Sequence, residues 1–167
     1  MTRPSLSALF DPRSVAVIGA SRDPSKVGGS VLANLHSAGF QGRVIPINAR
    51  ADRVQGLAAV ASMLDVAGPI DLAVITVPAA AVLPALKDCV AKGVPAAVVI
   101  SAGFREGGAE GHERERELRA WLDQNPVGFG GIYVEVLKDT SDLILVVFSF
   151  PRGVLGTIRA RLSRPAS

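Results

Sequence analysis

The sequence predicts an α/β fold in which a parallel sheet is flanked by helices in a three-layer arrangement. Three observations lead to this prediction. Four short runs of Val, Ile and Ala occur between residues 14 and 100, helical patterns separate them, and glycines end the helices. Strands that are apolar throughout are typical of a sheet covered on both faces. Right-handed β-α-β crossovers then place a ligand crevice at the carboxyl ends of the strands.

The elements follow from these patterns in order. Apolar runs predict strands over residues 14–18, 43–47, 71–77 and 96–100. Apolar residues spaced for one helical face predict a helix from Val27 until Gly39 and another from Ala79 until Gly93. The stretch 49–68 is expected to be a loop followed by a short helix around residues 59–66. A charged helix is expected over residues 110–124, after a glycine-containing loop.

Length and composition fit one globular domain. The chain has 167 residues, of which 49% are hydrophobic and 20% are charged, a balance typical of a protein with a buried core. The net charge is only +3, and much of it comes from arginines near the C-terminus instead of one continuous basic face. Nucleic acid is therefore not expected as a partner.

The sequence also favours a cytoplasmic protein that does not contact the membrane. Cys89 is the single cysteine, so no disulfide or thiolate metal cluster is expected, and we interpret this residue as part of the packing. The N-terminus lacks the apolar core of a secretory signal. The longest aliphatic run, residues 143–150, is far shorter than the roughly 20 residues that cross a bilayer.

Residues 15–29 are the most informative stretch, because an apolar strand leads into a loop with glycine and cations and then into a helix. Gly19 permits a tight turn at the end of the strand. The following helix directs free N–H groups and its dipole toward the crevice. This arrangement predicts a phosphate site. No nucleophile-base pair and no metal-ligand spacing is visible, so neither a catalytic residue nor a metal is expected; His36 and His112 are interpreted as surface or helix-flank residues.

Two ligands fit the charges around this loop. The Gly-x-Gly-x-x-Gly fingerprint of nicotinamide dinucleotide folds is absent, and no carboxylate follows the second strand. Instead Arg50, together with Arg53, can stand beside a phosphorylated ribose, while Arg22 and Lys26 flank the first loop. Coenzyme A carries a 3′-phosphate and a diphosphate, and a 2′-phosphorylated nicotinamide dinucleotide is the other candidate. Charge placement alone leaves both open.

Four stretches in the same order resemble a known family. They are residues 9–24, 26–29, 71–79 and 99–104. Together they are similar to the N-terminal coenzyme A binding domain of NDP-forming acyl-CoA synthetases, relatives of succinyl-CoA synthetase α subunits, over about residues 6–127. The resemblance implies a Rossmann-like fold that holds coenzyme A along the strand ends.

The resemblance also implies roles for particular residues. The loop after the first strand would hold phosphates, and its residues are Gly19, Ser21, Arg22, Asp23, Lys26, Val27 and Gly28. The end of the second strand would border the adenosine with Pro46, Asn48 and Arg50, and the end of the third strand would line the cleft wall with Thr76, Val77 and Pro78. The pantetheine arm would pass the end of the fourth strand at Ser101, Ala102 and Gly103.

The family pattern ends near residue 127. Residues 128–167 form an atypical segment rather than a full domain, with an added strand expected over 143–150 and a short basic helix over 154–162; residues 129–140 resemble a fragment of the ATP-grasp region of the same synthetases. The phosphohistidine and ATP-grasp domains are missing from this pattern. The expectation is a coenzyme A or acyl-CoA binding domain that is not catalytic alone.

Three alternatives stay open at this point. The first is a subunit of a split acyl-CoA ligase that acts in trans with separate phosphohistidine and ATP-grasp chains, or that self-associates. The second is an NADP-binding Rossmann protein. The third is a non-functional remnant of a synthetase gene.

Overall fold

A six-stranded sheet with the strand order β2-β1-β5-β6-β8-β7 forms the centre of the molecule. The computed structural model describes residues 5–104, 107–124, 132–135 and 144–148. The first four strands of that order run parallel to one another, and β8 and β7 continue the sheet in antiparallel pairing. The strands are β1 (Ser14–Ile18), β2 (Arg43–Ile47), β5 (Leu72–Ile75), β6 (Ala96–Ser101), β7 (Ile132–Glu135) and β8 (Ile144–Phe148).

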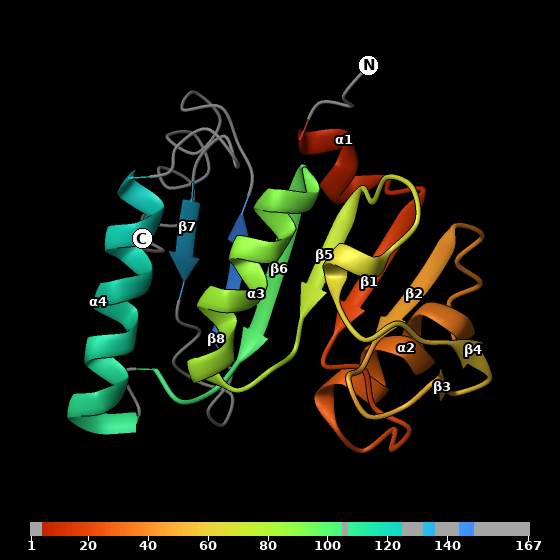
Figure 1. The fold of residues 1–167 in the computed structure, drawn as a ribbon, viewed down its shortest axis with the longest axis horizontal. Helices are drawn as coiled ribbons and strands as arrows, with labels where there is room; N and C mark the ends of the chain where they lie inside the picture. The colour runs from red at the N-terminus through yellow and green to blue at the C-terminus, as the bar shows by residue number, and fades with distance from the viewer. Residues whose placement is uncertain (1–4, 105–106, 125–131, 136–143, 149–167) are drawn as a thin grey trace, which may run out of the picture.

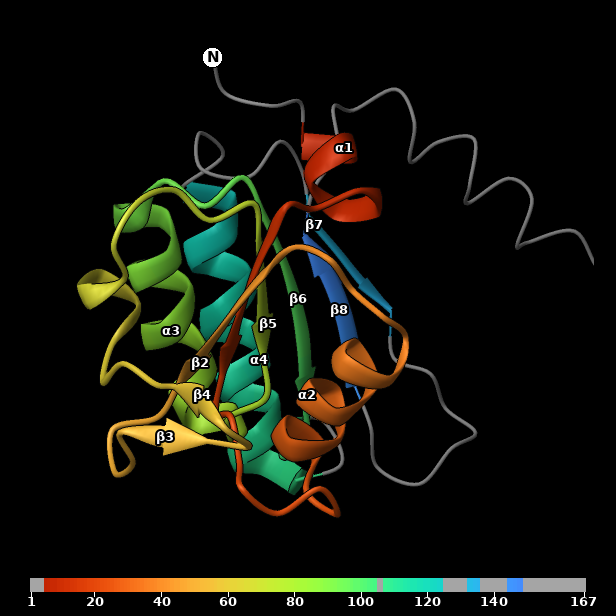
Figure 2. The same cartoon turned by 90° about the vertical axis from the view of Figure 1, so that its right-hand side faces the viewer.

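Helices cover both faces of this sheet, which confirms the three-layer arrangement. Helices α1 (Ser5–Phe10) and α2 (Val27–Ser37) lie on one face, and α3 (Ala79–Lys92) and α4 (Gly108–Gln124) lie on the other (Figures 1 and 2). A separate hydrophobic cluster fills each interface: Leu32 of α2 packs with Val15 and Val17 of β1, whereas Leu86 of α3 belongs to the cluster on the opposite face. No helix among the described residues is both long and apolar enough to cross a membrane.

The expected strands and helices agree closely with the structure. The first two strands have the expected bounds, the third is shorter than 71–77, and the fourth is one residue longer than 96–100. Strand β8 lies within the expected strand 143–150, but β7 was not expected as a strand, and neither was α1 as a helix. The expected helix over 154–162 lies outside the described residues.

The prediction of a short helix around residues 59–66 is wrong. The chain instead forms a small antiparallel hairpin from β3 (Arg53–Val54) and β4 (Leu57–Ala58), and only a single 3-10 turn, η1 (Met63–Asp65), follows. Val60 makes a parallel bridge with Ile47, which keeps the segment extended where a helix was expected. Met63 and Val66 are buried in the cluster beneath α3, so their three-residue spacing reflects one 3-10 turn instead of a helix.

The first turn of α2 packs directly on the end of β1, and glycines make this approach possible. Gly19 has a φ of +85°, a left-handed conformation, and a Cβ there would lie 2.9 Å from Thr76 Oγ1. A Cβ on Gly28 would overlap the Gly19 carbonyl oxygen and lie 2.7 Å from Thr76 Oγ1. A Cβ on Gly29 would overlap the Asp23 carbonyl oxygen. The glycines therefore bring three backbone segments together at one point.

Cys89 lies on α3 in the core, which confirms its interpretation as a packing residue. It is 0% exposed and belongs to the cluster between α3 and the sheet. Burial, with a smaller contribution from the Asp88 carboxylate, raises the pKa of the Cys89 thiol from 9.0 to about 12. The thiol is therefore protonated, and unreactive, at neutral pH.

We expect Gly28→Ala to lower the free energy of unfolding by roughly 1–3 kcal/mol or more, because the added methyl group overlaps backbone that cannot give way. Urea denaturation followed by circular dichroism measures this. The matched control is Gly107→Ala, since nothing lies within 4 Å of a Cβ at Gly107. Equal unfolding free energies for the two variants would contradict the close approach.

The Cys89 thiol of the native protein is expected to resist a disulfide reagent at about pH 8 and to react fully once denaturant is added. The raised pKa also predicts a pH dependence of the free energy of unfolding. The contribution of the Cys89 thiol to this free energy is complete below about pH 8. It falls as pH rises from about 9 toward 12, because in that range the thiol ionises in the unfolded chain and stays protonated in the folded one. Rapid labelling of the native chain would show that Cys89 is accessible.

Candidate functional site

The candidate site lies where the chain leaves β1 and β5 toward opposite faces of the sheet. After β1 the chain enters α2 on one face, and after β5 it enters α3 on the other (Figure 2). The two loops therefore separate at the carboxyl edge of adjacent strands. In open parallel sheets a divergence of this kind is where ligands bind.

Hydrogen bonds hold the strand ends at this edge in one arrangement. Thr76 donates to the Ile18 carbonyl oxygen from both its backbone nitrogen and its hydroxyl, each over 2.8 Å. The Ser101 hydroxyl is buried and donates to the Val77 carbonyl oxygen over 2.7 Å. The hydroxyls of Thr76 and Ser101, two of the predicted site residues, therefore join the ends of neighbouring strands. Val77 is half-buried, and Pro78 and Ala102 are exposed at the same edge.

Asp23 organises the loop after β1. Its carboxylate accepts from the backbone nitrogen of Ser25 over 2.9 Å and from the Ser25 hydroxyl over 2.6 Å. The Ser25 hydroxyl, more than any other group, lowers the pKa of the Asp23 carboxyl below its usual value, with further help from the Ser25 amide and Lys26. The Asp23 carboxyl is therefore ionised at neutral pH. The stability that its hydrogen bonds to Ser25 contribute is lost only as the pH falls through the lowered pKa.

The N-terminus of α2 faces this loop and lacks a side-chain cap. Lys26 is the N-cap residue in an extended conformation, and its side chain makes no capping hydrogen bond. The amides of Val27, Gly28 and Gly29 occupy the first turn, where no acceptor exists within the helix. Val27 is 40% exposed. These amides, together with the positive end of the helix dipole, make the end of β1 a candidate anion site.

The segment after β2 contributes one brace and one exposed cation. The Asn48 side chain donates to the Ala20 carbonyl oxygen over 2.8 Å and accepts from the Arg50 backbone nitrogen over 2.7 Å. Asn48 therefore fixes the position of the Arg50 backbone relative to the first loop. Pro46 lies inside β2 with its side chain fully buried, as β2 is an edge strand that tolerates the missing N–H.

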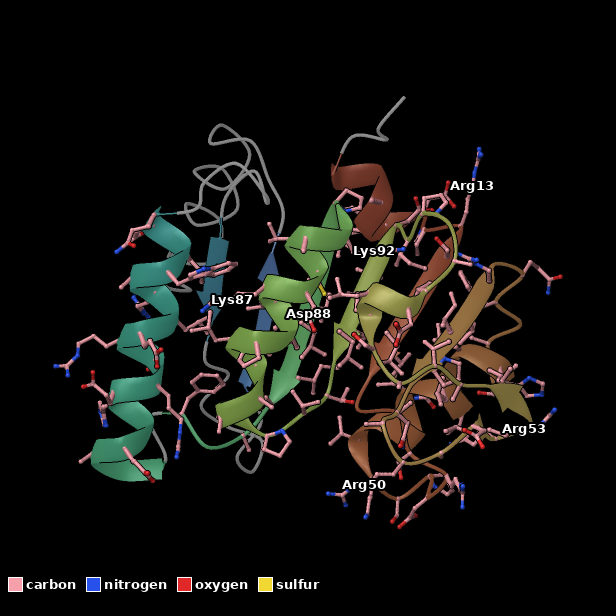
Figure 3. All side chains as sticks on the ribbon, in the orientation of Figure 1. Arg13, Arg50, Arg53, Lys87, Asp88 and Lys92 are labelled. Atoms are coloured by element: carbon pink, nitrogen blue, oxygen red, sulfur yellow. The ribbon has the colours of Figure 1, made fainter. Side chains whose placement is uncertain are left out.

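The four expected cations differ in what they contact. Arg22 Nε donates to the Arg53 carbonyl oxygen over 3.4 Å, and Arg53 Nη2 donates to the Gly56 carbonyl oxygen over 2.6 Å. Within the described residues, the side chains of Lys26 and Arg50 have no hydrogen-bond or ion-pair partner and are exposed. Arg50 and Arg53 lie at the end toward which the arrows of β1 and β5 point, and Arg13 lies at the opposite end (Figure 3).

Two structural contacts at this edge were missed by the sequence analysis. Gln55 has a φ of +47° and places its side-chain amide on the Ser21 and Gly29 carbonyl oxygens. Arg114 of α4 donates to the Gly103 carbonyl oxygen over 3.4 Å. The Gln55-Gly56 pair after Val54 is a turn signal, but nothing local indicates which distant carbonyls the amide reaches.

The histidines lie outside this arrangement. His36 is exposed on α2, and His112 Nδ1 lies 2.8 Å from the Gly108 carbonyl oxygen of its own helix. Among the described residues no group of three or more His, Cys, Asp or Glu side chains is placed to hold a metal ion. The groups that the carboxyl edge offers to a ligand are backbone amides and exposed cations, and such groups can bind an anion.

Comparison with known proteins points to the same ligand class. A family model described as a CoA binding domain matches residues 13–130. The ADP-forming acetate-CoA ligase II of Archaeoglobus fulgidus is 44% identical over 117 residues, which make up 70% of this chain and 17% of that protein. The α subunit of the ADP-forming acetate-CoA ligase II of Pyrococcus furiosus is 46% identical over 114 residues, or 68% of this chain and 24% of that subunit.

A solved structure shows the same fold. The dinucleotide-forming acetyl-coenzyme A synthetase 1 of Candidatus Korarchaeum cryptofilum, in complex with phosphate and ADP, aligns with a TM-score of 0.65 at 42% identity. The alignment covers 77% of this chain and 28% of that one. The chain thus spans less than a third of the length of these relatives. The match to the family model and these identities agree with the resemblance inferred from the sequence, and the chain belongs to the family of coenzyme A binding domains found in ADP-forming acyl-CoA synthetases.

Proposed function

We propose that this chain binds coenzyme A or acyl-CoA across the carboxyl edge of β2, β1, β5 and β6. The observation that carries the proposal is the uncapped first turn of α2, with an exposed cation at its N-cap, Lys26, and another at the same end of the sheet, Arg50, in a member of a coenzyme A binding family (Figure 3). A diphosphate and a ribose phosphate are the anions that such an edge would bind. The family match favours coenzyme A over a phosphorylated nicotinamide dinucleotide.

The diphosphate would bind at the anion site formed by the first loop and α2. Backbone amides bind phosphate oxygens without a side chain, and the helix dipole favours negative charge there. Gly28 allows the helix to start close to the end of β1. Lys26, at the N-cap, adds a mobile positive charge that suits a phosphate as a point charge. Ser21, Arg22 and Asp23 would shape the loop around the diphosphate.

Arg50 would bind the 3′-phosphate of the ribose. Its backbone is held by Asn48, while its guanidinium is exposed and has no partner among the described residues. A guanidinium in this state can form two parallel hydrogen bonds to a phosphate. Arg53 is a weaker candidate, because its guanidinium already donates to the Gly56 carbonyl oxygen.

The pantetheine arm would pass the ends of β5 and β6. Pro78 and Ala102 are exposed there, and Val77 is half-buried, so the wall carries apolar surface. The Ser101 hydroxyl is occupied by the Val77 carbonyl oxygen, and we therefore assign Ser101 to holding the wall in place. Gly103 has a φ of +100° and turns the chain away from the edge.

We place the coenzyme A binding unit at residues 1–127 and treat residues 128–167 as an appended segment. Strands β8 and β7 of this segment extend the sheet beyond β6. We propose that this unit binds its ligand and does not complete the ligase reaction by itself; it matches 17% and 24% of two relatives with that activity in their names. A cytoplasmic location remains a prediction.

A second candidate is a subunit of a split ligase. The Pyrococcus furiosus relative is an α subunit, so this domain occurs in a ligase built from more than one chain. In this case separate chains would supply the phosphohistidine and ATP-grasp parts. Restoration of acyl-CoA synthesis on adding such chains would distinguish this role from that of an independent binding module.

Calorimetric titration with coenzyme A and with its 3′-dephospho form tests the assignment of Arg50. The wild-type chain is expected to prefer coenzyme A, and Arg50→Ala should weaken coenzyme A binding by roughly tenfold to a hundredfold, because it removes one charge-assisted contact. Binding of the dephospho form should change little. The preference between the two ligands should therefore disappear.

The matched control is Arg13→Ala, which removes an exposed arginine at the opposite end of the molecule (Figure 3). It should bind both ligands as the wild type does. Equal affinity of the wild-type chain for the two ligands would remove Arg50 from the site. A folded chain that ignores both ligands at millimolar concentration would refute the proposed function.

The purified chain alone should form no acetyl-CoA from acetate, ATP, Mg²⁺ and coenzyme A, even at enzyme concentrations near those of the substrates. The reason is that the proposed role supplies a ligand site without a phosphoryl-transfer centre. Thioester formation measured by chromatography provides the readout. Product that forms in proportion to the amount of this chain would contradict a role limited to binding.

A further inference from the structure

The Gln55 side chain connects the hairpin to two parts of the anion site. Its Nε2 donates to the Ser21 carbonyl oxygen over 3.0 Å and to the Gly29 carbonyl oxygen over 2.9 Å. A side-chain amide nitrogen carries two N–H groups, enough for two acceptors, and both neighbours are carbonyl oxygens that can only accept. One side chain therefore joins the loop after β1 and the first turn of α2.

We propose that Gln55 is a positioning residue that holds this loop and the start of α2 in the arrangement that binds the diphosphate. This inference rests on the proposed function. Gln55 would act through backbone carbonyls, without touching the ligand. It adds a residue from the hairpin to a site otherwise built from the strand ends.

The hairpin that carries Gln55 is anchored independently of this amide. Val54 is 0% exposed and belongs to the cluster on the α2 side of the sheet. The Ala59 backbone nitrogen donates to the Asp52 carbonyl oxygen over 2.8 Å, and Val60 pairs with Ile47 of β2. Because the core and the sheet already fix the hairpin, the Gln55 amide is available to restrain the loop.

The backbone of Gln55 is itself unusual. Gln55 is the one non-glycine with a positive φ in the described part of the chain, at +47°, and Gly56 follows at +83°. Non-glycine side chains disfavour the left-handed region. A glycine or asparagine would suit this backbone better, so backbone preference does not account for the glutamine. Its long amide does reach the two carbonyls.

The two contacts have a consequence for the anion site. A trans peptide is planar, so its carbonyl and the following N–H point in opposite directions. When the Ser21 carbonyl is held toward the hairpin, the Arg22 N–H is turned away from the hairpin. The bond to Gly29 fixes the loop relative to the first turn of α2. A loop already held in place loses less conformational entropy when the ligand binds.

The test compares Gln55→Gly and Gln55→Asn with the wild type. Both substitutions suit a positive φ, and neither can span the distance that the glutamine amide spans. Each should weaken coenzyme A binding by about threefold to tenfold, the worth of one net hydrogen bond, at a melting temperature equal to or above that of the wild type. A purely structural role would instead lower the melting temperature.

Two further readouts make the result specific. Binding of coenzyme A and of the dephospho form should weaken by the same factor, since Gln55 acts on the diphosphate and not on the 3′-phosphate. Without ligand, amide hydrogen exchange in residues 20–30 should be faster than in the wild type, with the core strands unchanged. The matched control is Gln41→Asn, because among the described residues Gln41 Nε2 donates to the nearby Gly39 carbonyl oxygen alone, over 2.7 Å.

The outcomes separate this inference from the proposed function. Wild-type affinity and wild-type exchange in both Gln55 variants would overturn the role of Gln55 while leaving coenzyme A binding intact. A wild-type chain that binds no coenzyme A would refute the proposed function. If the wild-type chain binds no coenzyme A, hydrogen exchange still tests Gln55. Unchanged exchange in residues 20–30 of the variants would overturn the claim that Gln55 restrains the loop. Faster exchange there would show that Gln55 restrains the loop, although the loop does not bind coenzyme A.

Discussion

The close approach of α2 to the end of β1 is the constraint on which the rest of this structure depends. A side chain at Gly28 would overlap the Gly19 carbonyl oxygen, so only glycine lets the helix begin there. Thr76 then occupies the space beside Gly19 and ties the end of β5 to that of β1. As a result, helix amides and the ends of adjacent strands lie within one small region. That region is the candidate anion site.

Hydrogen bonds divide the polar residues of this region into braces, which join backbone segments, and cations whose side chains stay exposed. Thr76, Asn48 and Ser101 use their side chains to join one backbone segment to another. Arg22 and Arg53 are likewise engaged with backbone carbonyls. Lys26 and Arg50 have exposed side chains that make no hydrogen bond or ion pair within the described part of the chain. A brace has its hydrogen bonds satisfied within the protein, whereas an exposed cation remains available to an anion.

Local patterns were sufficient where one element determines its own structure. The strand 14–18 and the helix that begins at Val27 could be predicted from apolar runs, helical spacing and glycine. The structure of the stretch 53–65 could not be predicted in this way. Its apolar residues recur every three positions, a spacing that is also found in a helix, although here it arises from a hairpin and a 3-10 turn. Gln55 shows the same limit for the site: its two acceptors are 34 and 26 residues away in the sequence.

The sequence by itself determined the four parallel strands and the two helices α2 and α3 between them, the glycine loop after β1, the cations near it and the family to which the chain belongs. Each of these depends on residues that are close together in the sequence or on motifs in a fixed order. Only the tertiary structure decided which cations remain available, which hydroxyls serve as braces, and how the hairpin reaches the first loop. Those properties arise when side chains meet carbonyls from distant segments, and no local pattern encodes that pairing.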